Sequence, residues 1–201
     1  MPGLNSISNI LFDLDGTLVD SSRTIEMSLV HALERIGINP LAKGPVRSFI
    51  GVPLFDIFRG GFGMSEKDTH AAITFYRDYY DALNQAGSKV YDQVPEVLSA
   101  LRDQGYDLFI ATVKPTEIAE KVLCDLELRP FFAGIAGASM GPERRDKTGI
   151  IAHALEQFAL EAEVSLMVGD RDQDIDGARA NGLRSVAVSY GFGSMDELFG
   201  A

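Results

Sequence analysis

Two aspartates, Asp13 and Asp15, stand two residues apart directly after an apolar run, within the segment FDLDGTL at residues 12–18. At this spacing a strand points both side chains to the same face. Adjacent carboxylates are unfavourable unless a cation or a phosphoryl group lies between them. Gly16 then permits a sharp turn. A turn with capping aspartates would explain a lone Asp-Gly pair, but the whole heptapeptide indicates a functional site.

A second acidic segment, GDRDQD at residues 169–174, also follows an apolar run. Because ligands of open α/β sheets bind at the carboxyl ends of the strands, we expect Asp170 to face Asp13. Carboxylate oxygens are the ligands that Mg²⁺ prefers. The alternative is an acidic helix N-terminus stabilised by the helix dipole. Together with the first segment, this one predicts a metal site, to which Asp172 contributes less than Asp170 and Asp174.

The segment FDLDGTLVD, residues 12–20, is similar along its whole length to the first motif of the haloacid dehalogenase superfamily. The resemblance covers nearly the entire chain, including a helical cap. It implies that Asp13 is the nucleophile that becomes an aspartyl phosphate, and that Asp15 is the general acid and then the base. It also implies Mg²⁺ as cofactor, with Asp13, Asp15 and Asp170 at the metal and Asp174 as a hydrogen-bonding or water-mediated ligand.

The second motif of the resembling family corresponds to Thr112, whose hydroxyl would donate to the substrate phosphate. The family usually has Asn or a small residue next, where this chain has Val113. That difference removes a possible side-chain donor and leaves the backbone N–H. Lys114 fits the continuation seen in many of these phosphatases, so we expect all three residues to bind substrate. A strand-end threonine with no function is the simpler reading of Thr112 alone.

Lys147 is our choice for the third motif, the cation that offsets charge on Asp13 and on the phosphoryl group. It opens a predicted helix, although the proline that often follows it in the family is missing. The neighbouring Arg144 and Arg145 are competing candidates, and a solvated run of charges is the alternative interpretation of the segment.

Composition excludes several functions. With 18 basic and 29 acidic residues, the formal charge is −11, which disfavours nucleic acid as a partner. The apolar runs are shorter than the ~20 residues of a membrane span, and no signal peptide is evident. The single cysteine, Cys124, is compatible with a reducing compartment, so we expect a cytoplasmic protein. Its place on an apolar helix face predicts a buried side chain.

The elements that position these residues form an α/β pattern. Five short apolar runs predict buried parallel strands, at residues 10–12, 108–111, 134–136, 166–168 and 186–188. Helical patterns separate them, and about 90 residues lie between the first strand and the next. We therefore predict a Rossmann-like parallel sheet at residues 1–19 and 89–201, with an inserted all-helical cap at residues 20–88.

Asp15 narrows the chemistry, because the dehalogenases and phosphonate hydrolases of the family lack a second acidic residue there. The sequence predicts a Mg²⁺-dependent phosphatase of small metabolites, similar to phosphoglycolate phosphatases and bacterial 5′-nucleotidases. A sugar-phosphate mutase, a receiver-type phospho-acceptor and a non-catalytic partner-binding protein are the alternatives. Within the cap, Arg47 follows the helix-initiating Pro45 and is our candidate for contacting the leaving group. The oligomeric state stays open.

Overall fold

The computed structural model describes residues 7–83, 87–139 and 144–201. The chain divides into two compact units. We call the first, Met1–Asp20 together with Val90–Ala201, the core unit, and the second, Ser21–Lys89, the inserted unit. The strands β2 (Val19–Asp20) and β3 (Lys89–Val90) form a two-stranded sheet where the chain passes from one unit to the other.

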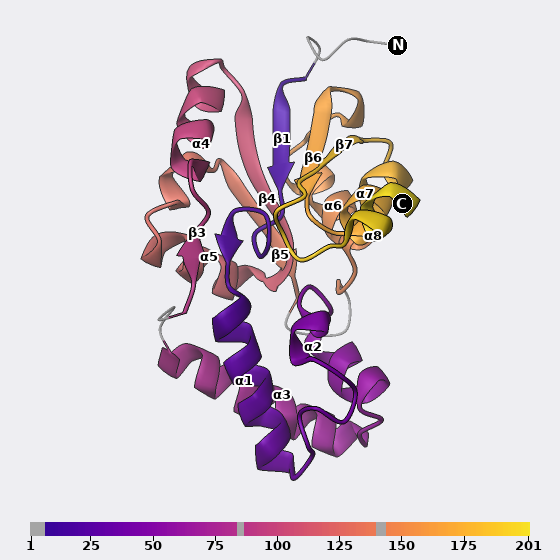
Figure 1. Ribbon diagram of the computed structural model, residues 1–201. Coiled ribbons are helices and arrows are strands. Elements are labelled where there is room, and N and C mark those ends of the chain that lie inside the picture. Colours follow the sequence, from indigo (N-terminus) through magenta and orange to yellow (C-terminus); the bar gives the residue numbers. More distant parts are fainter. Residues whose placement is uncertain (1–6, 84–86, 140–143) are drawn as a thin grey trace. The chain divides into compact units, whose positions relative to one another are not determined.

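The core unit is built on a five-stranded sheet with the order β5-β4-β1-β6-β7. All the paired strands run parallel, so their carboxyl ends meet at one edge (Figure 1). This confirms the predicted α/β fold. The strands are β1 (Asn9–Phe12), β4 (Asp107–Pro115), β5 (Gly134–Ala138), β6 (Ser165–Gly169) and β7 (Arg184–Ala187).

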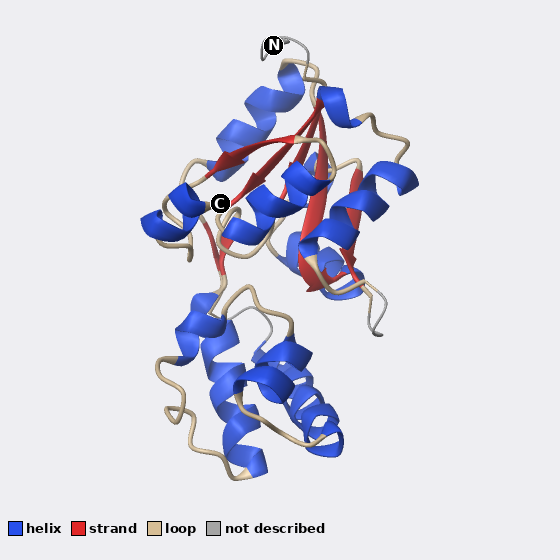
Figure 2. Ribbon diagram, turned by 90° about the vertical axis from the view of Figure 1, so that its right-hand side faces the viewer, coloured by secondary structure: helices blue, strands red, loops and turns tan. Residues whose placement is uncertain are grey.

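Helices cover both faces of this sheet (Figure 2). Because strand residues alternate between faces, Ile10 and Phe12 of β1 belong to one apolar cluster and Leu11 belongs to another. The first cluster includes residues of α4 and α5, and the second includes residues of α6 and α7. The bounds of these helices are α4 (Val94–Asp103), α5 (Thr116–Asp125), α6 (Lys147–Gln157) and α7 (Asp172–Ala180).

Shorter elements complete the core unit. Two 3₁₀ turns, η4 (Arg129–Phe131) and η5 (Ala162–Val164), precede strands β5 and β6. A terminal helix, α8 (Met195–Gly200), begins after Ser194, whose side chain accepts a hydrogen bond from the Glu197 N–H at 3.1 Å. This capping contact matches the Ser-x-x-Glu spacing in the sequence.

The described part of the inserted unit consists of helices joined by loops, and Lys89 at its end belongs to β3 (Figure 2). Its helices are α1 (Ser22–Ile36), the 3₁₀ turn η2 (Val46–Phe49), α2 (Leu54–Asp56), the π-turn η3 (Ile57–Gly61) and α3 (Glu66–Leu83). Helix α1 ends at Gly37, which has φ = 81° and adopts the left-handed conformation that glycine favours. Helix α3 begins after Ser65, whose hydroxyl accepts from the Asp68 N–H at 3.1 Å.

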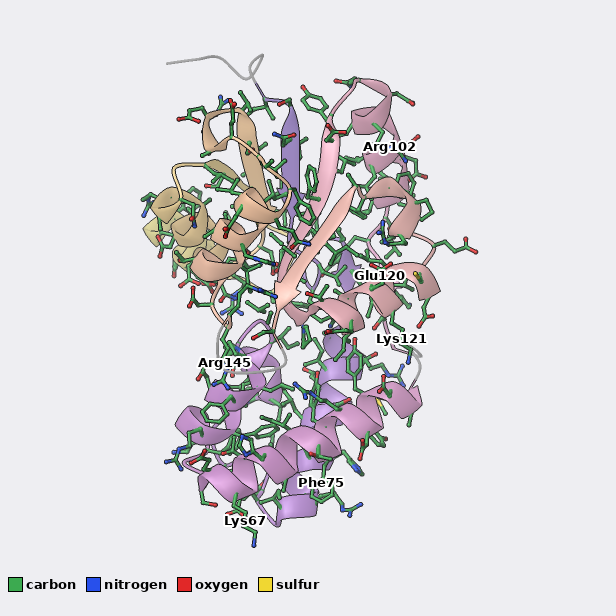
Figure 3. All side chains as sticks on the ribbon, turned by 180° about the vertical axis from the view of Figure 1, so that it is seen from behind. Lys67, Phe75, Arg102, Glu120, Lys121 and Arg145 are labelled. Carbon is green, nitrogen blue, oxygen red and sulfur yellow. The ribbon has the colours of Figure 1, made fainter. Side chains whose placement is uncertain are left out.

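The two long helices of the inserted unit pack through aromatic rings. His31 of α1 stacks on Tyr79 of α3, with ring centroids 4.2 Å apart. One turn further along, the Arg35 guanidinium lies 4.4 Å from the centroid of the Phe75 ring, which is labelled in Figure 3. Contacts of this kind join the two helices beyond simple apolar burial.

Two features differ from expectation. Strand β7 is the edge strand of its sheet, and Val186 is 46% exposed, so the prediction of a buried strand at residues 186–188 was wrong at Val186. Cys124 is exposed as well, so the prediction of a buried cysteine was wrong; the buried face of α5 consists of Ala119, Val122 and Leu123. Among the described residues, no helix combines the length and apolar character that a membrane span requires.

Candidate active site

Several of the predicted functional residues lie at the carboxyl edge of the sheet. Phe12 of β1 is in register with Val168 of β6, so Asp13 and Asp170 follow neighbouring strands at almost the same height. The Asp13 N–H donates to the Val168 carbonyl oxygen at 2.9 Å. On the other side of β1, Phe12 pairs with Ile110 of β4, two residues before Thr112. Segments distant in sequence therefore meet because the strands are parallel and adjacent.

Three carboxylates form the centre of the site. Oxygen atoms of Asp13, Asp170 and Asp174 all lie within 4.8 Å of one another. The three residues are only 4%, 0% and 1% exposed. Burial of like charges at such separations is costly unless a cation compensates them.

Lys147, the first residue of α6, supplies part of that compensation. Its ammonium lies 2.8 Å from Asp13 Oδ1 and 2.7 Å from Asp174 Oδ1, and it donates to the Ala111 carbonyl oxygen at 3.0 Å. Burial alone would lower the pKa of Lys147, but the charges of Asp13 and Asp174 outweigh it and raise that pKa above its usual value. Lys147 is therefore held as a cation between two carboxylates.

The remaining charge fits a divalent cation. When all three carboxylates are ionised, as metal binding requires, they and the Lys147 ammonium carry a net charge of −2 in a buried site. The ligand oxygens around an octahedral Mg²⁺, at about 2.1 Å from the ion, lie about 3–4 Å apart, compatible with this cluster. Burial first, and the neighbouring Asp13 charge second, raise the pKa of Asp170 to about 7. The donor set is thus all-oxygen and short of positive charge, as a hard cation requires.

Asp170 has a donor for each of its carboxylate oxygens. The Thr17 hydroxyl donates to Oδ1 at 3.1 Å, and the backbone N–H of Phe192 donates to Oδ2 at 2.7 Å. Each oxygen retains lone-pair capacity beyond these bonds. Asp170 is therefore oriented while still able to bind an ion.

Asp174 is engaged differently. Its Oδ1 pairs with Lys147, and its Oδ2 accepts from the N–H groups of Asp170 and Arg171 at 3.1 and 3.0 Å. Burial raises the pKa of Asp174 to about 6, against the opposing effect of Lys147. A β-carbon at Gly169 would overlap the Asp174 carboxylate, so glycine permits this close approach. Both Asp174 oxygens already have partners, an arrangement suited to orienting Asp170 and Lys147.

Asp15 lies apart from the three clustered carboxylates, and its place at the metal stays a prediction. Among the described residues, the carboxylate cluster does not include it. Its Oδ2 instead accepts from the Lys114 ammonium at 2.6 Å, in an ion pair that is mostly buried. Lys114 lies two residues after Thr112 on β4 and supplies the cation of this pair. The spacing of the first motif alone does not show this pairing.

Of the other predicted binding residues, Thr112 and Val113 belong to β4 and Arg47 belongs to the inserted unit. Thr112 is buried in β4, and its hydroxyl accepts from the Lys114 N–H at 3.3 Å. Val113 is half-buried and packs against the apolar cluster on the α6 side. The backbone of Arg47 belongs to η2, and its side chain lies outside the described part of the chain.

The structure also separates Lys147 from its neighbouring arginines. The Arg144 guanidinium donates through Nε to the Gly137 carbonyl oxygen at 3.0 Å, so it is directed to the backbone of β5. Arg145, labelled in Figure 3, is half-buried just before Asp146. Asp146 caps α6 by accepting from the Gly149 N–H at 2.8 Å. The cap fixes the start of the helix at Lys147, which is the cation that reaches Asp13.

Sequence reasoning missed the partners of Asp170. Thr17 belongs to the first motif, but its hydroxyl had no assigned role, and Phe192 was not considered. The one available signal was the pair Gly191 and Gly193, since a β-carbon at either position would overlap Asp170. Closely spaced glycines indicate a close approach of backbone to another group.

The chain matches the family model described as haloacid dehalogenase-like hydrolase over residues 10–188. It is 38% identical to a 5′-nucleotidase of Pseudomonas aeruginosa over 190 residues, which cover 94% of this chain and 86% of the relative. It is 39% identical to the tyrosine-protein kinase PtkA of Mycobacterium tuberculosis over 189 residues, which are 93% of this chain but only 64% of that protein. A phosphoglycolate phosphatase of Aquifex aeolicus is 28% identical over 183 residues, which are 91% of this chain and 85% of that protein.

Solved structures show the same fold. The crystal structure of a predicted phosphatase from Clostridium acetobutylicum superposes with a TM-score of 0.91 at 36% identity. The similarity covers 96% of this chain and 90% of that one. These matches confirm the family resemblance inferred from the four motifs.

Proposed function

Since the chain belongs to the haloacid dehalogenase-like hydrolase family and is a phosphatase, we propose that it hydrolyses small phosphomonoesters in a Mg²⁺-dependent reaction through an aspartyl phosphate. The observation that carries this proposal is the buried cluster of Asp13, Asp170 and Asp174 with Lys147, whose charge of −2 calls for a divalent cation. The acid–base candidate Asp15 lies two residues after the nucleophile.

The residues can perform the reaction in two steps. A carboxylate oxygen of Asp13 attacks the phosphorus, and the bond to the leaving oxygen breaks as Asp15 gives that oxygen a proton. Asp15, now ionised, takes a proton from water, and the water oxygen attacks the phosphorus of the aspartyl phosphate. The bond to Asp13 breaks, which restores its carboxylate and releases inorganic phosphate.

Several neighbours prepare these steps. Lys147 holds the Asp13 carboxylate through the 2.8 Å ion pair and reduces the repulsion met by an anionic phosphoryl group. Lys114 positions the Asp15 carboxylate through the 2.6 Å contact. We infer that Thr112 and the Val113 N–H bind phosphoryl oxygens. Mg²⁺, when bound by Asp13 and Asp170, would neutralise phosphoryl charge and align the attack.

Removal of the metal tests the first part of this proposal. Treatment with EDTA should abolish hydrolysis of p-nitrophenyl phosphate, and added Mg²⁺ should restore it. Ca²⁺ should inhibit, because its looser coordination misaligns the attack. Full activity in a metal-free preparation would contradict the assignment.

The names of the relatives support a proposal for the substrate class. One is named a 5′-nucleotidase and another a phosphoglycolate phosphatase, so we propose a phosphoglycolate-like or nucleoside monophosphate-like substrate. We infer that the inserted unit serves as the cap that selects the leaving group, with Arg47 as candidate contact. The single cysteine also favours a cytoplasmic setting.

A turnover screen with Mg²⁺ across phosphoglycolate, nucleoside monophosphates, sugar phosphates and phosphotyrosine identifies the class. We expect one substrate to reach a kcat/KM of about 10⁴ M⁻¹s⁻¹ or more, in the range of natural enzyme–substrate pairs. The measurement is release of inorganic phosphate. A mutase would instead convert one sugar phosphate into an isomer without net release, which would overturn the hydrolase assignment.

A further inference from the structure

A loop far from the first motif contacts both Thr17 and Asp170. We call residues 189–193 the bracing loop. It follows β7, whose Ala187 pairs with Gly169 of β6, and the Val188 N–H donates to the Gly169 carbonyl oxygen at 2.9 Å. This pairing brings the loop beside Asp170, the residue that follows Gly169.

The bracing loop makes one of the two hydrogen bonds that orient the Asp170 carboxylate. The Phe192 N–H donates to Oδ2 at 2.7 Å, while the Thr17 hydroxyl donates to Oδ1 at 3.1 Å. With one donor on each oxygen, rotation of the carboxylate about its χ2 angle is restricted. Groups that hold a metal ligand in this way set its affinity for the ion.

Glycines make the approach of the loop possible. A β-carbon at Gly191 would overlap the side chain of Asp170, and one at Gly193 would overlap its carbonyl oxygen. The loop backbone therefore touches Asp170 directly. A loop that served only to connect two elements would not need this proximity.

Tyr190 extends the same network to Thr17. Its hydroxyl donates to the Thr17 carbonyl oxygen at 2.9 Å, and its ring lies against Tyr91 with centroids 4.8 Å apart. Thr17 is thus held through its carbonyl by Tyr190 and acts through its hydroxyl on Asp170. Tyr190 is 52% exposed and belongs to neither apolar cluster of the core unit.

We propose that the bracing loop is a positioning element of the metal site, in which the Phe192 N–H fixes Asp170 directly and the Tyr190 hydroxyl fixes it through Thr17. The inference rests on the proposed function, because it takes Asp170 as a Mg²⁺ ligand. Tyr190 and Thr17 are positioning residues here, since they act on the ion through the carboxylate of Asp170.

Four variants test the proposal. Tyr190→Phe removes the hydroxyl but keeps the ring contact with Tyr91. Thr17→Val removes the donor to Asp170 at nearly constant volume, and Thr17→Ser restores a hydroxyl. Tyr106→Phe is the matched control, because Tyr106 is a half-buried tyrosine just before β4, at the opposite end of the sheet.

Mg²⁺ is titrated into each metal-free protein and its dissociation constant is obtained from the rise in Tm. We expect binding to weaken about 3- to 10-fold in Tyr190→Phe, the effect of one neutral hydrogen bond. We expect a loss of about 10-fold or more in Thr17→Val, as for partners of metal ligands, with rescue in Thr17→Ser. In assays, the KM for Mg²⁺ should rise, while kcat of Tyr190→Phe at saturating Mg²⁺ stays near that of the wild type.

The outcomes separate this inference from the proposed function. If the wild-type protein binds Mg²⁺ and both Tyr190→Phe and Thr17→Val bind it equally well, the bracing loop does not position Asp170, and the hydrolase assignment stands. A Tm drop without any change in Mg²⁺ affinity would also overturn the inference, by showing a purely structural role. If the wild-type protein binds no Mg²⁺, the magnesium site and the inference both fail.

Discussion

The chemistry of individual residues depends here on how buried charges are balanced. Asp13 shares the Lys147 ammonium with Asp174, whereas Asp15 has a separate cation in Lys114. The two carboxylates of the first motif therefore occupy different electrostatic environments, although only Leu14 lies between them in the chain. In the proposed mechanism, this difference allows one carboxylate to attack phosphorus while the other donates and accepts protons.

Substitution of the two aspartates distinguishes their roles. Asp13→Asn should abolish both phosphoenzyme formation and turnover, because an amide is not a competent nucleophile. Asp15→Asn should slow turnover roughly 10²–10⁴-fold, the usual contribution of general acid–base catalysis. Trapping of the phosphoenzyme and steady-state kinetics measure the two effects.

The leaving group provides the control for Asp15. An activated aryl phosphate needs little protonation of its leaving oxygen, so Asp15→Asn should impair the phosphorylation step less with this substrate. If the alkyl and aryl substrates lose equal activity in single-turnover measurements, Asp15 is not the general acid.

The ionisation of Asp170 predicts a pH dependence of metal binding. Its pKa is raised from 3.8 to about 7 in the metal-free protein, so the folded state binds the proton more tightly than the unfolded state. The stability of the metal-free protein should therefore fall as pH rises from about 4 to about 7, and this loss is complete above that window. Mg²⁺ needs the ionised carboxylate, so its affinity should increase about tenfold from pH 6 to pH 8.

Thermal unfolding with and without Mg²⁺ at the two pH values measures this effect. The rise in Tm caused by Mg²⁺ should be larger at pH 8. Asp170→Asn is the control variant, since it cannot titrate and should show little response to Mg²⁺ at either pH. A Mg²⁺ response that is equal at both pH values in the wild-type protein would contradict a raised pKa for Asp170.

At the scale of elements, helix starts and glycines place the catalytic groups. Helix α6 begins at Lys147 because Asp146 caps it, and Gly177 of α7 leaves room for the lysine stem, since a β-carbon there would lie 3.1 Å from Lys147 Cγ. The position of the cation is thus a consequence of how two helices begin and pack.

Removal of the α6 cap should destabilise the protein modestly. Asp146→Ala leaves the Gly149 N–H without its partner, at a cost of about 1 kcal/mol, which corresponds to a fall in Tm of about 2–4 °C for a domain of this size. Asp146→Ser keeps a capping oxygen and should retain most of the stability. Calorimetry measures the Tm of the three proteins. Equal Tm values for Asp146→Ala and the wild type would show that the cap does not stabilise the protein.

For the molecule as a whole, the candidate active site lies in one of the two compact units. The cluster of Asp13, Asp170 and Asp174 lies within the core unit, and the contacts between α1 and α3 give the inserted unit its own packing. Selection of the leaving group by the inserted unit stays a prediction.

Arg47→Ala tests this prediction in the complete protein. The substitution should raise KM for the physiological substrate, because it removes a cation that would contact the leaving group. It should spare a small aryl phosphate, which makes no such contact. Lys43→Ala, a nearby basic residue before the same 3₁₀ turn, serves as the control for a general loss of positive charge. Equal responses of the two substrates would remove Arg47 from the specificity residues.

The sequence by itself determined the α/β architecture and the groups at its carboxyl edge. Motifs directly after apolar strands identify Asp13, Thr112 and Asp170, because parallel strands bring their ends to one edge whatever the details of packing. Residues that favour helix ends also stand at observed boundaries: Gly37 follows α1, and Ser65 and Ser194 precede α3 and α8. These features depend on near neighbours in the chain.

Only the tertiary structure decided which group pairs with which. The partner of Asp15 is 99 residues away, and the amide that orients Asp170 is 22 residues away on an irregular loop. The exposure of Cys124 depends likewise on which face of α5 is covered. No local periodicity encodes such contacts, because they form between segments that are distant in the sequence and that pack together in the folded chain. A buried charge is stable there only beside a partner group.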